Sequence, residues 1–222
     1  MSEILIIKFL HLLAFVYWLG GDLGTFYASH FVVKSDLDKS ARVTALDIMM
    51  GCDQAPRLCM PLILALGVHL SFAMGYMQIS FLWVVLTWLV CLLWVGMVLA
   101  IHFGHGKQWL PGLQRFDLNF RYVIIVILAA SAIYGLVTGA IYQGNWLAVK
   151  VLVFVGMMIC GLMIRRQLAN FIPAWIKLTS EGADDETNAA IASSIRACHP
   201  YVYLIWAGLL INAALGLHLI IF

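Results

Sequence analysis

Charged residues are scarce in this chain of 222 residues. Asp, Glu, Lys and Arg make up only 11% of it, and the formal net charge is +2. A soluble globular domain has about 25% charged residues, so the composition argues against an ordinary soluble domain. The small net charge and the lack of any run of Lys or Arg argue against a nucleic-acid partner.

Cysteine patterns and nucleotide-binding motifs are also lacking. The five cysteines show no CxxC and no Cys/His spacing of a metal site, and an odd, scattered set does not form a disulfide framework. There is no GxGxxG, Walker or HExxH sequence, so the chain has no nucleotide-binding motif of its own, and if electrons enter from NADH or flavin, a partner must supply them. Residues 4–20 have neither a charged n-region nor an A-x-A site, and we expect no cleaved signal peptide.

Long apolar runs are abundant, because 64% of the residues are apolar. A helix needs about 20 apolar residues to cross the hydrocarbon core of a bilayer. Six stretches meet this requirement, which predicts an all-α, polytopic bundle of about six transmembrane helices in a single membrane domain (residues 1–222). The predicted spans are residues 4–24 (with a helical extension towards Val33), 58–78, 80–103, 121–142, 146–164 and 201–221.

Three longer connections join these spans. Residues 34–56 are amphipathic and predict a surface helix capped by Ser35 or Asp36. Residues 104–120, which contain GHGKQWLPGLQ, predict a loop interrupted by Gly and Pro. Residues 165–200 hold the polar stretch SEGADDETN, and we expect a short helix after it that Pro200 ends.

The basic residues predict the orientation of the chain. The connections after the first, third and fifth spans hold eleven of the thirteen Lys and Arg residues: Lys34, Lys39, Arg42, Arg57, Lys107, Arg115, Arg121, Arg165, Arg166, Lys177 and Arg196. The opposite side holds the other two, Lys8 and Lys150. Because basic residues favour the cytoplasmic side, we expect these long loops in the cytoplasm and both termini outside.

Histidines are the main candidate ligands. With a rise of 1.5 Å per residue, His11 lies roughly 10 Å and His69 roughly 13 Å from the outer face, and His218, in the last turn of the last span, is close in depth to both. Polar groups within a membrane usually face the bundle interior for a functional reason. His11 and His69 are therefore candidate axial ligands of a haem b, with His218 able to replace either; interhelical hydrogen bonds and a proton path are the alternatives.

A second group of polar residues falls near the cytoplasmic boundary. It consists of His30, His102, His105 and His199. These histidines could hold a second haem, line a quinone pocket or be wet boundary residues. Asp22 lies near the cytoplasmic end of the first span, where it could pair with Arg57 or Arg121 or take part in proton transfer.

Lys150 lies about four residues into the fifth predicted span, near the outer face. A lysine in this position can extend its ammonium group to the interface. Alternatively, it can provide a cation for a haem propionate or an anionic substrate at the level of His11.

Three segments resemble the HemJ-type protoporphyrinogen oxidases and the wider CopD-like membrane proteins. They are KFLHLLAFVYWLGG (8–21), PRLCMPLILALG (56–67) and NWLAVKVLVFVG (145–156), within about residues 1–170. The resemblance implies that His11 is a haem ligand and that Lys150 is functional. It also implies a multi-pass protein of a bacterial inner membrane.

These observations predict a b-type haem membrane oxidoreductase or electron-transfer protein with His11 and His69 on the iron. One haem is expected, or two if the cytoplasmic histidines also ligate. The expected partners are membrane lipid, a quinone or porphyrin substrate, and a redox partner or a second copy of the chain. The alternatives are a CopD-like copper or small-solute transporter and a membrane anchor subunit of a redox complex.

Overall fold

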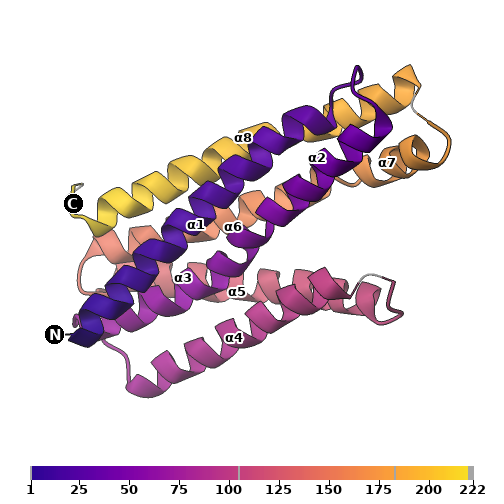
Figure 1. The fold of residues 1–222 in the computed structure, drawn as a ribbon. Helices are drawn as coiled ribbons and strands as arrows, with labels where there is room; N and C mark the ends of the chain where they lie inside the picture. Colours follow the sequence, from indigo (N-terminus) through magenta and orange to yellow (C-terminus); the bar gives the residue numbers. More distant parts are fainter. Residues whose placement is uncertain (1, 105, 183, 220–222) are drawn as a thin grey trace. The chain divides into compact units, whose positions relative to one another are not determined.

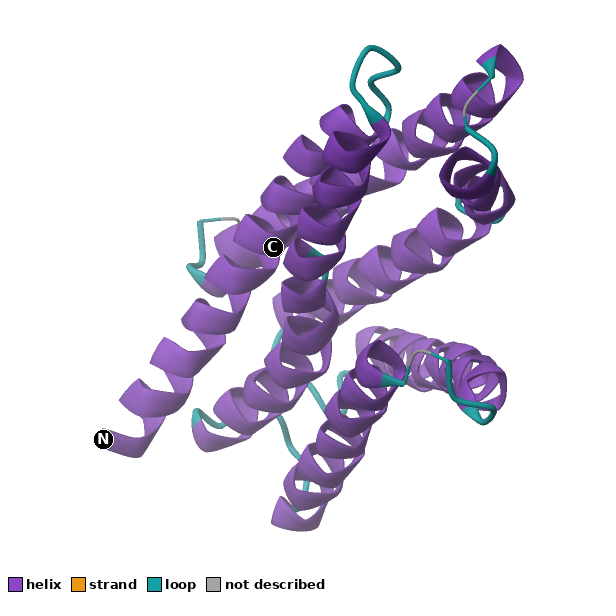
Figure 2. Ribbon diagram, turned by 45° about the vertical axis from the view of Figure 1, so that its right-hand side comes forward, coloured by secondary structure: helices purple, strands orange, loops and turns teal. Residues whose placement is uncertain are grey.

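The computed structural model describes residues 2–104, 106–182 and 184–219, and this part of the chain is built from helices (Figure 1). They are α1 (Ser2–Val32), α2 (Lys39–Cys52), α3 (Gln54–Ala73), α4 (Phe81–Phe103), α5 (Leu110–Thr138), α6 (Asn145–Gln167), α7 (Phe171–Ser180) and α8 (Asp185–Gly216). Figure 2 shows helices and loops but no strand among the described residues. The predicted all-α fold is therefore confirmed.

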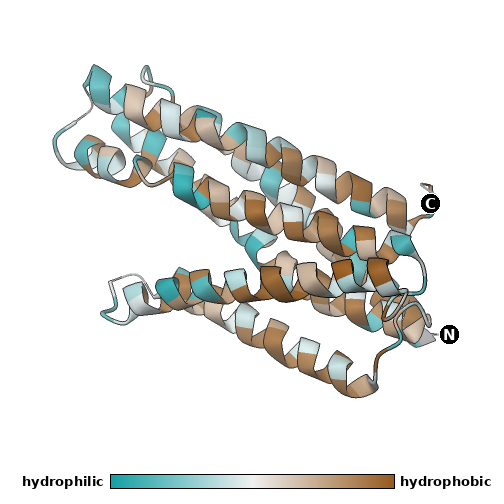
Figure 3. Ribbon diagram, turned by 180° about the vertical axis from the view of Figure 1, so that it is seen from behind, coloured by the Kyte–Doolittle hydropathy of each residue, from teal (hydrophilic) through white to brown (hydrophobic). Residues whose placement is uncertain are grey.

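Among the described residues, six helical segments are long and apolar enough to cross a bilayer. They are Glu3–Val32, Lys39–Ala73, Phe81–Phe103, Leu110–Thr138, Asn145–Gln167 and Asp185–Gly216. Figure 3 shows hydrophobic residues along most of their length. The predicted number of spans is confirmed, and the chain is a multi-pass membrane protein.

Large apolar side chains on these helices face outward. Leu93 on α4 is 74% exposed and Val137 on α5 is 80% exposed. Such apolar surfaces are unfavourable in water but match the hydrocarbon of a bilayer. The helical backbone can also lie in hydrocarbon, because its polar groups form hydrogen bonds within the helix.

The predicted cap of the amphipathic helix was wrong. Its N-cap is Asp38, whose side chain accepts a hydrogen bond from the backbone N–H of Ala41 at 2.9 Å. A carboxylate at this position satisfies one of the free N–H groups of the first turn, and the helix therefore starts at Lys39. Arg42, Ala45 and Met49 are buried, so α2 packs one face against the protein.

The predicted loop over residues 104–120 is only partly a loop, because α5 begins at Leu110. Pro111 lies in its first turn. Proline is tolerated there because the N–H that it lacks would have no partner within the helix anyway. Residues 110–120 therefore extend α5 by three turns, and Asp117 within them is buried.

The prediction that Pro200 ends a helix was also wrong. Pro200 lies inside α8, which continues from Asp185 to Gly216. Proline removes one hydrogen bond from a helix interior, but membrane helices tolerate it where neighbouring groups satisfy the freed carbonyl. The polar connection before α8 also contains a helix that was not predicted separately, α7.

The chain forms two compact units. The first consists of Met1–Trp18, Arg57–Val155 and Leu209–Phe222, and the second of Leu19–Pro56 and Gly156–Gly208. Whether they act as one membrane domain stays a prediction. The first unit has a buried cluster of Ala132, Tyr142, Leu147 and Ala148. The second has a core of Ala28, Val32, Ala45, Met49, Phe171, Leu178, Ile191 and Ile195.

Candidate functional site

His11 lies on α1 in the first unit, and its imidazole packs against the backbone of α3. A Cβ atom on Gly67 would come within 3.1 Å of His11 Cε1, so the missing side chain of Gly67 makes room for the ring. One turn earlier on α3, the backbone of Ile63 forms a hydrogen bond with His11. The other ring nitrogen, Nδ1, is buried and has no hydrogen-bond partner among the described residues.

Lys150 lies on α6 in the same unit and interacts electrostatically with His11. Its ammonium group lies against the end of α8, where a Cβ atom on Gly216 would be 2.7 Å from Nζ. Both polar side chains thus lie where a glycine exposes the helix backbone. The structure brings together the two residues that the sequence placed at similar depth.

The two glycines were not identified as site residues from the sequence. Gly67 stands two residues before His69, and Gly216 two residues before His218. Their role depends on which helix faces them, and the order of residues along one helix does not contain that information.

The described contacts of His69 are with Trp88 and Glu3. The Nε1–H group of Trp88 on α4 donates to His69 Nδ1 at 3.3 Å, and His69 Nε2 lies 3.7 Å from a carboxylate oxygen of Glu3. Residues two apart on a helix point roughly 200° apart, so His69 cannot share the direction of Gly67, where His11 packs. Coordination by His69 together with His11 stays a prediction.

His218, the predicted substitute ligand, packs into an aromatic cluster just after α8. Its ring centroid is 4.8 Å from that of Trp146 and 6.3 Å from that of Tyr76, with edge-on geometry in both cases. Its backbone φ of 54° lies in the left-handed region. These contacts are consistent with a packing role at the end of the span.

The residues present fit a haem that His11 would hold. His11 offers a buried ring nitrogen with no described partner, and imidazole is a common axial ligand. Lys150 lies close enough to supply a positive charge for a propionate. His69 would first have to give up its hydrogen bond from Trp88. Among the described residues, no three His, Cys, Asp or Glu side chains gather as they would around a bare metal ion.

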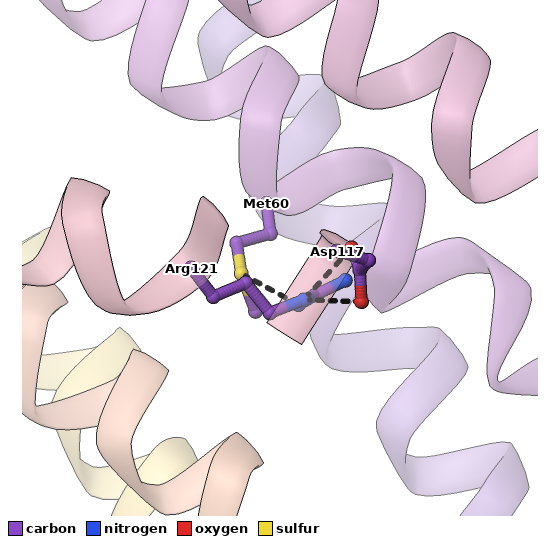
Figure 4. A network of polar contacts seen from close by, with 3 residues as sticks. All are labelled: Met60, Asp117 and Arg121. Atoms are coloured by element: carbon purple, nitrogen blue, oxygen red, sulfur yellow. Dashed lines mark hydrogen bonds and ion pairs between the residues drawn. The ribbon is translucent and has the colours of Figure 1, made fainter. Parts of the chain in front are cut away.

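A buried ion pair in the first unit was not predicted (Figure 4). Arg121 on α5 donates from Nε to both carboxylate oxygens of Asp117, at 3.1 and 3.0 Å, and its Nη1 lies 3.9 Å from the sulfur of Met60. The guanidinium group also stacks 5.2 Å above the ring of Trp94. The i,i+4 spacing was a visible signal for this pair, but the segment with Asp117 was predicted to be a loop.

Arg121, one of the two suggested partners of Asp22, thus forms an ion pair with Asp117. Asp22 belongs to the second unit and Arg57 to the first. The pairing of Asp22 with Arg57, and a proton-transfer role for Asp22, stay predictions.

The histidines that were predicted to lie at the cytoplasmic boundary separate into different environments. His30 on α1 and His199 on α8 lie together in the second unit, with ring centroids 6.0 Å apart. His102 on α4 belongs to the first unit and packs against Phe103, with centroids 4.8 Å apart. His105 lies outside the described residues. The structure therefore brings together one pair of this group, His30 and His199.

We compared the chain with family models, with curated proteins and with solved structures, and none of them matches. The resemblance to the HemJ-type oxidases and the CopD-like proteins stays a prediction.

Proposed function

We propose that this chain is a membrane electron-transfer protein that binds haem b through His11. The observation that carries the proposal is the buried Nδ1 atom of His11, which has no hydrogen-bond partner among the described residues. Leaving a buried polar group unpaired costs about 1–3 kcal/mol. A metal that coordinates this nitrogen would offset that cost.

The surroundings of His11 support a ligand role. Gly67 lets the ring lie directly against α3, and the hydrogen bond with Ile63 holds its orientation. His11 is therefore held against α3, and its buried Nδ1 atom has no hydrogen-bond partner among the described residues.

Lys150 supports the same proposal through its charge. A lysine within a span is expensive unless an anion or water accompanies it. The propionates of haem are such anions, and Lys150 lies within electrostatic reach of His11. In this proposal Lys150 binds a propionate, and its positive charge favours the reduced state of the haem. Bound haem supplies one-electron oxidation and reduction.

An absorption spectrum tests the proposal. The full-length protein, purified from cells with ample haem, should show a b-type α-band in the reduced-minus-oxidised difference spectrum. His11→Ala should lose the band, because it removes the ligand. His218→Ala is the matched control and should keep it, because His218 packs against Trp146 and Tyr76.

Two further variants refine the test. Lys150→Ala should keep the band but lower the midpoint potential, because a positive charge near the haem favours the reduced form. His69→Ala shows whether the second axial position is filled by this residue, since the band shifts or disappears only in that case. A colourless wild-type protein would contradict the proposal and would favour transport or anchoring instead.

A further inference from the structure

A cavity of about 350 Å³ lies in the second unit between α1 and α8. Its lining residues are Ser29, His30, Val33, Ala192, Ile195, Arg196 and His199. Small-molecule sites typically have volumes of about 300–1,000 Å³ and apolar walls with a few polar groups. The cavity is therefore large enough for a head group of one or two rings.

The two imidazoles of this cavity have hydrogen-bonding capacity left. His30 uses Nδ1 on the backbone carbonyl of Phe26 at 2.8 Å, so its Nε2 can accept a hydrogen bond. Nε2 of His199 is buried and has no partner among the described residues. One wall thus offers an acceptor and, with the proton on Nε2 of His199, a donor.

Aromatic rings surround these imidazoles. The ring centroid of Phe26 lies 4.8 Å from that of His30 and 4.9 Å from that of His199. The ring centroids of Tyr203 and Trp206 lie 5.7 and 5.2 Å from that of Phe26, and Tyr203 is also 6.2 Å from His199. These rings pack against the two imidazoles from outside the cavity, whose lining does not include them, and they hold the imidazoles in position.

The position of the cavity along the helices suits a ligand that arrives through the membrane. The span Glu3–Val32 has 30 residues, which corresponds to about 45 Å of helix, whereas the hydrocarbon core is about 30 Å thick. His30 stands two residues before the end of α1, and we therefore expect the cavity near the boundary between hydrocarbon and head groups.

The chemistry of the walls favours a neutral ligand over an anionic one. A phosphate needs several charged or N–H donors, and its desolvation between apolar walls is costly. Arg196 is the lining cation, but it is exposed and donates its Nε–H to the carbonyl of Ala192 in its own helix. A planar ring with two oxygen atoms, in contrast, needs only one or two hydrogen bonds.

We propose that this cavity binds the head group of a membrane quinone, with His199 and His30 as its hydrogen-bonding residues. His199 donates to a carbonyl oxygen of the quinone, and His30 accepts from a hydroxyl group of the quinol. The proposal does not depend on haem, because binding of the quinone can be measured in protein that carries none.

Binding of ubiquinone-1 to the full-length protein in phosphatidylcholine nanodiscs tests the proposal. We expect saturable binding by calorimetry and a loss of about tenfold in affinity in His199→Ala, as for one hydrogen bond lost from an apolar site. His199→Gln keeps an N–H donor and should recover part of the affinity. His102→Ala, in the first unit, should bind like the wild type. Equal affinity in all four proteins would overturn the proposal.

Photocrosslinking of the wild-type protein provides a test that needs no variant. An azidoquinone should label peptides that contain residues 26–33 or 192–199 of the chain. Labelling confined to other segments would overturn the proposal. Protection of these residues by phosphatidylglycerol, together with no detectable binding of ubiquinone-1, would also overturn it, because the site would then belong to an anionic lipid.

Discussion

The two units of the molecule use histidine in different ways. In the first unit, His11 packs against the backbone of α3 at Gly67, beside Lys150. In the second unit, His30 and His199 line a cavity of about 350 Å³. The residue type is the same, but one imidazole packs against a helix backbone and the other two lie in the wall of a cavity.

This difference indicates what each region can do. A side chain held against a glycine has one defined position, which suits a ligand that must stay fixed on a cofactor. A cavity with apolar walls and two free nitrogens suits a small molecule that enters and leaves. We therefore assign haem to His11 and a quinone head group to His30 and His199, and each assignment can fail without the other.

The largest effect on stability is expected for the ion pair of the first unit. Asp117→Ala leaves the partly buried charge of Arg121 without its carboxylate; removing one partner of a fully buried pair typically costs about 3–5 kcal/mol, which is the upper bound here. The free energy of unfolding, measured in detergent by denaturant titration, should fall by up to this amount. The double variant Asp117→Leu/Arg121→Met should recover most of it. An unchanged stability in Asp117→Ala would show that this pair does not support the first unit.

A slightly smaller effect is expected for Arg42 in the second unit. Arg42 donates to the carbonyl of Val32 at 2.9 Å and to the side chain of Asn188 at 2.8 Å, and it thereby joins α2 to α1 and α8. Arg42→Ala should cost about 2–4 kcal/mol, since hydrogen bonds of charged groups contribute about 1.5–3 kcal/mol each. The affinity for quinone should fall as well if the shape of the cavity depends on the hydrogen bonds that Arg42 makes to α1 and α8. Arg196→Ala is the exposed control and should leave the stability nearly unchanged.

The glycine next to His11 gives a sharper test of the first unit. Gly67→Ala places a methyl group 3.1 Å from His11 Cε1 and should cost about 1–3 kcal/mol through overpacking. Haem content should fall with it, because the imidazole must move. Gly96→Ala is the matched control on α4, where a Cβ atom meets nothing within 4 Å. The Gly96→Ala protein should keep the haem, and its free energy of unfolding should rise by up to about 1 kcal/mol because Ala has a higher helix propensity than Gly.

The smallest effect is expected for an exposed pair outside the spans. Lys177 Nζ donates to Asp184 at 2.7 Å, and this hydrogen bond holds the pKa of the Asp184 carboxyl well below its usual range. A depressed carboxyl pKa adds stability that is present above the unfolded value, near 4, and is lost as the pH falls through the folded value. The difference in melting temperature between the wild type and Asp184→Asn should therefore be small at pH 7 and shrink below pH 4. A difference that grows on acidification would contradict this account.

The six spans could be predicted because their apolar length is a property of the sequence alone. The ends of the helices were harder to predict from the sequence. Pro200 and the GHGKQWLPGLQ segment carry residues that usually break helices, yet α8 passes through Pro200 and α5 starts at Leu110. In a membrane the backbone must find its hydrogen bonds within the helix, and this requirement outweighs the local preference.

The candidate site was predictable in part. The depth of His11 and Lys150 followed from their positions along the spans, and the structure places them near one another. The hydrogen bond between His69 and Trp88 could not be predicted from the sequence, because it depends on which helix lies beside α3. The same holds for Gly67 and Gly216, whose contacts come from helices distant in sequence.

The haem content of three purified proteins tests most directly the claim that the two histidine groups act differently. Pyridine-haemochrome assays should give one haem per chain in the wild type and in His199→Ala, and none in His11→Ala, while the affinity for ubiquinone-1 falls about tenfold in His199→Ala and is unchanged in His11→Ala. Two haems in the wild type, with one lost in His199→Ala, would contradict the account, as would a haem content that His11→Ala leaves unchanged.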